Sequence, residues 1–161
     1  MASHRINRET FHYKWDNAHQ PVISIKSGDT VTFEINEVTS WQITKTSTSE
    51  TLARLDDSKL YPLAGPVYVE DAEAGDTLVV RVKKVKPGRF GWSGISPGLG
   101  LLEEFNKPFL YKWNLTSSKF ARFKKGIKIP IRPMMAPDEP TDMPSGDHQR
   151  LSMNPATPVT R

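Results

Sequence analysis

The sequence contains no cysteine among its 161 residues. This absence excludes disulfide bonds, thiolate zinc sites and a thiol nucleophile. No apolar run approaches the roughly 20 residues that a membrane-spanning helix needs, so we expect no membrane partner. The start, MASHRINRET, is polar and lacks the apolar core of a signal segment. We therefore expect a cytoplasmic location.

Histidine is scarce, and acidic residues are missing from one long segment. Histidines occur only at positions 4, 12, 19 and 148. Residues 105–137 carry eight basic side chains and no acidic one, whereas residues 1–104 carry 12 basic and 14 acidic side chains. The net charge of +4 therefore arises from one segment and does not describe the whole chain.

The basic segment 105–132, FNKPFLYKWNLTSSKFARFKKGIKIPIR, interleaves cations with aromatic residues. Such a segment can bind single-stranded nucleic acid through phosphate pairing and base stacking. The alternation of Phe109, Tyr111 and Trp113 also fits a strand with one buried aromatic face and solvated lysines. We favour the strand and do not expect a nucleic-acid partner. The alternative is a noncatalytic β-domain that binds nucleic acid or a protein through this segment.

A short pattern occurs twice and predicts a mostly β fold. PVISIKSGDTVTFEI (21–35) and GPVYVEDAEAGDTL (65–78) share Gly-Asp-Thr, followed by apolar residues at alternate positions. Glycine readily adopts the positive φ of a tight turn, and Asp29 or Asp76 can bond nearby amides. The alternation in the second copy predicts a strand over residues 78–82. We expect two related β units, packed as a sandwich or an open barrel.

Composition divides the chain at residue 133. Residues 1–133 are predicted to form the β-rich domain, with a short helical turn near Glu50 to Leu55 in a long loop rich in serine and threonine. Residues 134–161 hold five prolines and no aromatic residue. We expect this irregular tail to be disordered or loosely attached, because it has no residues to build a core.

Five consecutive phrases carry a resemblance to a known family. They read FHYKWDNAHQPVISIKSGDTVTFEI, SWQITKTSTSETLARLD, YPLAGPVYVEDAEAGDTLVVRVKKV, FGWSGISPGLGLL and GIKIPIRPMMAPDEP. In this order, over roughly residues 8–140, they resemble the acetamidase/formamidase family of small-amide hydrolases. The phrase at 65–76 is similar to the family signature Gly-Pro-Val-Tyr-Val-Glu-Gly-Ala-Glu-Pro-Gly-Asp. Asp71 and Ala74 stand where the family has Gly and Pro.

The resemblance implies hydrolysis of a small linear amide, such as formamide or acetamide, to a carboxylate and ammonia. This reaction needs an activated water, a stabilised oxyanion and an acid for the leaving amine. By the same resemblance the candidate catalytic residues are His12, in a His-x-x-Trp phrase with Trp15, and Glu70 and Asp76 in the signature. A divalent metal held by one histidine and carboxylates stays open, since no compact ligand spacing is present.

Each candidate also has a structural interpretation. His12 can cap a strand or bond a loop carbonyl, Glu70 can be a solvated edge residue, and Asp76 can simply form its turn. Asp147 and His148 are similar to a Gly-Asp-x-His phrase of the family's carboxy-terminal half. They fall in the predicted tail, where a site is difficult to preorganise.

The family's carboxy-terminal phrases, Gly-Gly-Asn-x-Asp and Gly-Asp-x-His-x-x-Gln-Gly-Asp-Gly-Glu, do not occur in this sequence. The chain therefore resembles the amino-terminal half of such an enzyme, and whether that half is active stays open. Without covering strands, sheet edges and apolar surface would be exposed. We expect the chain to form a homo-oligomer or to pair with a full-length relative.

Overall fold

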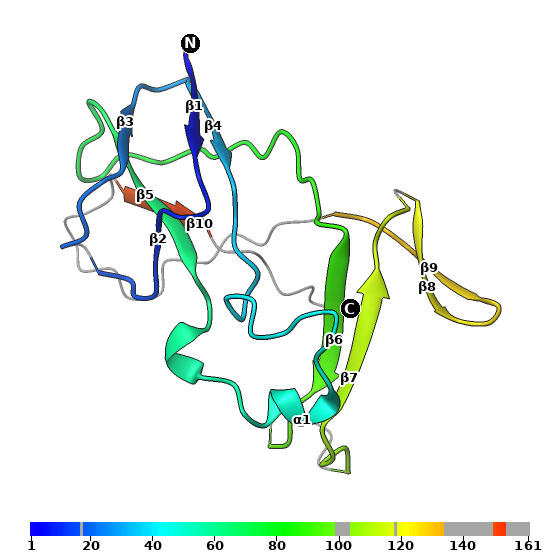
Figure 1. The fold of residues 1–161 in the computed structure, drawn as a ribbon. Coiled ribbons are helices and arrows are strands. Elements are labelled where there is room, and N and C mark those ends of the chain that lie inside the picture. Colours follow the sequence, from blue (N-terminus) through cyan, green and yellow to red (C-terminus); the bar gives the residue numbers. More distant parts are fainter. Residues whose placement is uncertain (17, 99–103, 118, 134–149, 154–161) are drawn as a thin grey trace. The chain divides into compact units, whose positions relative to one another are not determined.

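The structure is a computed structural model that describes residues 1–16, 18–98, 104–117, 119–133 and 150–153 (Figure 1). In chain order its elements are β1 (Ser3–Ile6), β2 (Phe11–His12), β3 (Ile23–Ile25), β4 (Thr30–Phe33), α1 (Ser49–Leu52), the 3-10 turn η1 (Asp57–Lys59), β5 (Leu63–Val69), β6 (Phe90–Ile95), β7 (Phe109–Asn114), β8 (Phe120–Lys124), β9 (Ile127–Pro130) and β10 (Arg150–Met153). The predicted mostly β fold and the helical turn near Glu50 are thus confirmed. Within these ranges, no helix is long and apolar enough to cross a bilayer.

Strand β5 is the strand with the most partners. Its beginning pairs antiparallel with β2, where His12 lies opposite Leu63, and its end pairs parallel with β3, where Ile25 lies opposite Val69. β10 pairs antiparallel with β5 as well. The backbone groups of such a strand are paired on both edges. Leu63 and Val67 are almost completely buried.

The chain folds as two compact units. Unit 1 consists of Met1–Ser40, Ser58–Lys83 and β10, and it holds the β5 sheet and the parallel pair β1–β4. Unit 2 consists of Trp41–Asp57 and the described part of 84–133, and it holds the two antiparallel pairs β6–β7 and β8–β9. Unit 1 buries the side chains of Ile6, Leu63, Ala64 and Val67, and unit 2 buries Ile43, Leu52 and Ala121.

The repeated Gly-Asp turn has the same geometry in both copies. Gly28 has φ 89° and Gly75 has φ 103°, values that L side chains rarely adopt. The Asp29 amide donates to the Lys26 carbonyl at 3.0 Å, and the Asp76 amide donates to the Glu73 carbonyl at 3.1 Å. The structural role that the sequence predicted for this turn is confirmed.

The strand predicted over residues 78–82 is not formed. Residues 70–89, all of them described, contain no strand, and the side chains of Leu78, Val79, Val80 and Val82 are 45–81% exposed. In the first copy, β4 finds a parallel partner in β1. The second copy has no such partner among the described residues, and apolar alternation without a neighbouring strand does not make a ladder.

Two related β units are therefore not observed, because only the first copy continues into a strand. The described strands form several small sheets, so the sandwich or open barrel stays a prediction. Within the predicted tail, residues 150–153 form β10 against β5. The rest of 134–161 lies outside the described residues, and the division at residue 133 stays a prediction as well.

The Ile43→Ala substitution tests the core of unit 2. Ile43 is completely buried, so its truncation leaves a cavity and is expected to lower the free energy of unfolding by about 2–5 kcal/mol. The matched control is Ile127→Ala, because Ile127 is 48% exposed and its truncation leaves no cavity. Urea denaturation measures both. Equal losses of unfolding free energy in the two variants would contradict the burial of Ile43.

Candidate functional site

His12 lies at the end of β2, beside the beginning of β5 (Figure 1). Its Nδ1 is 2.7 Å from the carbonyl oxygen of Lys14. A carbonyl only accepts hydrogen bonds, so Nδ1 carries the proton and Nε2 is the basic nitrogen of the neutral ring. The bond to a loop carbonyl, which belongs to the structural interpretation of His12, is thus present, and it leaves Nε2 as the nitrogen that can accept a proton.

Burial lowers the pKa of His12 below its ordinary value. The hydrogen bond to the Lys14 carbonyl opposes this shift, and the neighbouring His19 adds to it when His19 is charged. The two imidazole rings have their centroids 4.4 Å apart and are tilted by 33°. His12 is consequently neutral at physiological pH, the form that accepts a proton or binds a metal.

His19 is the residue near His12 that the sequence analysis did not single out. A turn brings it there, in which Asp16 Oδ1 accepts from the Ala18 amide at 2.8 Å and the Asp16 carbonyl accepts from the His19 amide at 3.2 Å. Aspartate side chains commonly bond the amide two residues on. The Asp-Asn-Ala sequence between the two histidines was therefore the signal that could have indicated their proximity.

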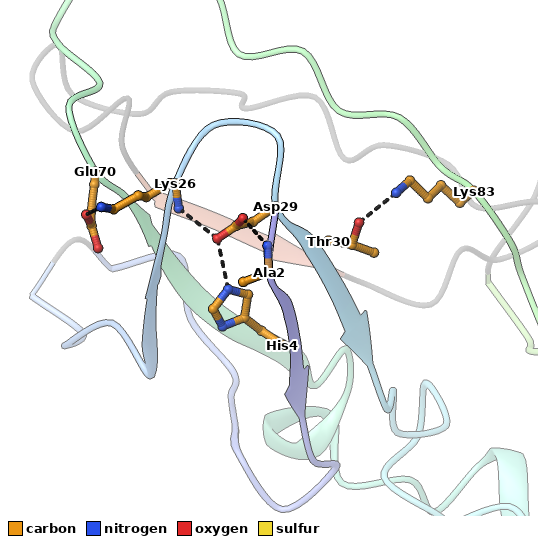
Figure 2. A network of polar contacts seen from close by, with 7 residues as sticks. All are labelled: Ala2, His4, Lys26, Asp29, Thr30, Glu70 and Lys83. Carbon is orange, nitrogen blue, oxygen red and sulfur yellow. Dashed lines mark hydrogen bonds and ion pairs between the residues drawn. The ribbon is translucent and has the colours of Figure 1, made fainter.

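Glu70 directly follows β5 and lies on a solvated edge. Its amide donates to the Ile25 carbonyl at 2.8 Å, which extends the pairing of β3 with β5 by one residue. Its carboxylate is 3.9 Å from Lys26 Nζ, and both side chains are well exposed (Figure 2). An exposed pair of this kind contributes at most about 1 kcal/mol. Glu70 is accessible to a ligand but is not enclosed by the elements around it.

Asp76 is engaged in its turn. Its Oδ2 accepts a hydrogen bond from the Glu73 amide at 3.0 Å. This bond is the counterpart of the bond that Asp29 accepts from the Lys26 amide at 3.2 Å in the first copy. The geometry agrees with the structural interpretation of Asp76, and its catalytic role stays a prediction.

Asp29 joins the amino terminus to the first turn (Figure 2). Its carboxylate accepts from the Ala2 amide at 2.6 Å and from His4 Nε2 at 3.0 Å, besides the bond from Lys26. These three bonds, that from Ala2 above all, hold the pKa of Asp29 well below its usual range. The network uses His4 structurally, so His4 is no rival to His12 as the catalytic imidazole.

The structure does not bring the three predicted catalytic residues together. His12 lies opposite Leu63, at the beginning of β5, and Glu70 follows the last residue of that strand. In a regular strand, at about 3.3 Å per residue, the seven steps from residue 63 to residue 70 span about 23 Å. His12 and Glu70 are thus at opposite ends of β5, and Asp76 lies in the turn beyond Glu70.

Among the described residues no group of three histidine or acidic side chains could hold a metal ion. His12 and His19 supply two imidazoles, which is fewer than the three protein ligands of a catalytic zinc site. Asp147 and His148 lie outside the described residues. Whether the chain binds a divalent metal therefore stays open.

Comparison with known proteins establishes the class to which the chain belongs. The Acetamidase/Formamidase family matches residues 2–135. A candidate formamidase of Schizosaccharomyces pombe is 33% identical over 99 residues, which are 58% of this chain and 24% of that protein. The chain belongs to the acetamidase/formamidase family of amide hydrolases.

Solved structures agree with this membership. An acetamidase from Bacillus halodurans superposes with a TM-score of 0.74 and 32% identity, over 81% of this chain and 44% of that one. A predicted acetamidase/formamidase from Thermoanaerobacter tengcongensis superposes with a TM-score of 0.73 and 26% identity, over 94% of this chain and 48% of that one. The chain thus corresponds to less than half of each of these relatives.

Asp71 occupies a backbone conformation that favours glycine. Its φ is 62°, and it stands where the family signature has Gly. Aspartate tolerates this region better than most residues, but glycine carries no Cβ penalty there. The departure from the signature is therefore expected to cost stability.

The Asp71→Gly substitution is expected to raise the free energy of unfolding by about 1 kcal/mol, because it removes that penalty. The control is Glu73→Gly in the same loop, where φ is not positive; there the added backbone freedom should lower stability by roughly 0.5–1 kcal/mol. Chemical denaturation compares the two. A loss of stability in both variants would show that the Asp71 side chain stabilises the turn.

Proposed function

We propose that this chain binds a small linear amide, of the size of formamide or acetamide, and hydrolyses its carbon–nitrogen bond. The observation that carries the proposal is His12, whose ring is kept neutral by burial and fixed in one tautomer by the Lys14 carbonyl. Family membership supports the reaction class. The S. pombe relative is a candidate formamidase, and the two solved relatives are an acetamidase and a predicted acetamidase/formamidase.

In the proposed reaction, His12 Nε2 takes a proton from water, and the resulting hydroxide attacks the amide carbonyl carbon. The tetrahedral intermediate then collapses, and its nitrogen leaves as ammonia with the proton that His12 returns. The products are a carboxylate and ammonium after proton exchange with solvent. His19, whose ring centroid is 4.4 Å from that of His12, is the side chain that we assign to donate to the oxyanion.

Glu70 is not assigned to the same site as His12. Because β5 lies between His12 and Glu70 in the sheet, we do not assign Glu70 to the substrate that His12 acts on in the same molecule. If Glu70 takes part, it does so at a second point or from another chain. Substitution of Glu70 therefore reports on a different question from substitution of His12.

The His12→Gln substitution is expected to reduce ammonia release from formamide and acetamide about 10²–10⁴-fold, the usual effect of removing a general base. Lys14→Gln is the control, since it keeps the carbonyl that orients His12.

Activity of the unchanged chain should fall as the pH drops through the pKa of His12, which lies below its ordinary value of about 6.5 because burial disfavours the charged ring.

Ammonia release that survives in His12→Gln would overturn the role of His12. Release that is absent from the unchanged chain, while circular dichroism shows a folded protein, would overturn the activity itself. A loss on Glu70→Gln equal to that on His12→Gln would show that the two residues act in one site formed between molecules.

We further propose that the strip formed by Leu78, Val79, Val80 and Val82 pairs with a second copy of the chain. These side chains are exposed and lie in a segment without strand partners among the described residues. Contiguous apolar surface of this kind marks an interaction site. Strands added along the strip would extend unit 1 toward the predicted sandwich or open barrel.

Size-exclusion chromatography with light scattering is expected to give a dimer for the unchanged chain. Val80→Lys should shift the protein toward monomer, because it places a charge within the strip. Ile127→Lys is the matched control, with comparable exposure on β9 of unit 2, and it should remain dimeric. A monomeric unchanged chain would contradict the proposal.

A further inference from the structure

Unit 2 contains an open pocket, and none of its lining residues is one of the proposed amidase residues. Its volume is about 450 Å³, within the range of small-molecule sites. The lining residues are Lys45, Arg89, Phe90, Lys112, Trp113, Asn114 and Thr116. Three of these side chains are cationic, two are aromatic and none is acidic.

The pocket is built on the antiparallel pair β6–β7. Trp113 lies opposite Gly91, and its indole Nε1 donates to Ser93 Oγ at 2.8 Å, which fixes the orientation of the ring. Lys112 Nζ donates to the carbonyl oxygens of Lys45 and Ser47 at 2.9 Å and 2.8 Å. These bonds hold the 45–47 loop at the rim and keep the Lys112 charge beside the pocket.

The positive charge of the pocket is not neutralised locally. Lys45, Arg89 and Lys112 form no ion pair with a carboxylate among the described residues. Segment 105–137, which contributes four of the seven lining residues, carries eight basic residues and no acidic one in its sequence. Uncompensated cations gathered around a concave surface attract anions, and lysine and arginine form charge-assisted hydrogen bonds with phosphate groups.

Aromatic rings continue from the pocket onto β8. The ring centroids of Trp113 and Tyr111 are 4.5 Å apart, and those of Trp113 and Phe123 are 5.6 Å apart. Lys124 Nζ lies 5.5 Å from the centroid of Phe123. On the same hairpin, Lys128 Nζ lies 4.9 Å from the centroid of Phe120. Cations and half-buried rings thus alternate beyond the pocket.

We propose that this pocket binds a nucleotide unit, with its phosphate at the three cations and its base stacked on the Trp113 cluster. Basic grooves beside aromatic rings bind nucleotides in this way with little dependence on sequence. A free nucleotide and a single-stranded nucleic acid offer the same chemistry. The cations and rings along β8 offer contacts for further nucleotides of a single-stranded nucleic acid. This site is independent of the amide hydrolysis proposed for unit 1.

The test uses the full chain at physiological ionic strength. Calorimetry measures binding of adenosine triphosphate and of inorganic phosphate, and fluorescence anisotropy measures binding of a labelled oligothymidylate. The Lys45→Gln/Arg89→Gln variant should weaken nucleotide or oligonucleotide binding about tenfold or more. Lys14→Gln/Arg81→Gln removes the same charge from exposed positions of unit 1 and should leave binding within about twofold.

Affinity for adenosine triphosphate alone would identify a free nucleotide as the ligand, and affinity that grows with oligonucleotide length would identify a single strand. Trp113→Leu should weaken binding of the nucleotide but not of inorganic phosphate. Equal losses of affinity in the pocket and control variants would show that binding depends only on the overall charge of the protein, and would overturn the proposal. The absence of binding by any of the three probes would overturn it as well.

Discussion

The arrangement of unit 1 depends on the pairing of β5, whose backbone has partners over its whole length. β2 covers its beginning, β3 its end, and β10 its other edge. These partners pair the backbone of the strand on both edges, and the buried side chains of unit 1 lie mainly on it. The same pairing positions His12 at one end and Glu70 at the other.

Local sequence predicted the turns better than the strands. Gly28 and Gly75 both adopt positive φ, and Asp29 and Asp76 make equivalent bonds, since these interactions are complete within four residues. The strand expected over 78–82 was wrong because a strand needs a partner, and alternation does not say whether one is available. Long-range pairing, such as that of β10 with β5, has no local signal at all.

The candidate site was predicted in part. The His-x-x-Trp phrase led to His12, and the structure adds the carbonyl that orients it and the burial that keeps it neutral. His19 was missed because its approach depends on an aspartate turn rather than on a spacing typical of ligands. The signature places Glu70 and Asp76 close to each other in sequence. Their separation from His12 by the length of β5 became evident only from the pairing register of the strands.

The separation of His12 from Glu70 is the central claim, because it decides whether one chain can hold both residues in one site. The chain has no cysteine, so spin labels can be attached at Lys14→Cys and Glu70→Cys without removing native thiols. Pulsed electron resonance measures the distance between them. We predict a separation of about 20 Å or more in magnetically diluted protein, as the length of β5 requires. A separation of about 10 Å, shorter than the strand allows, would contradict the account.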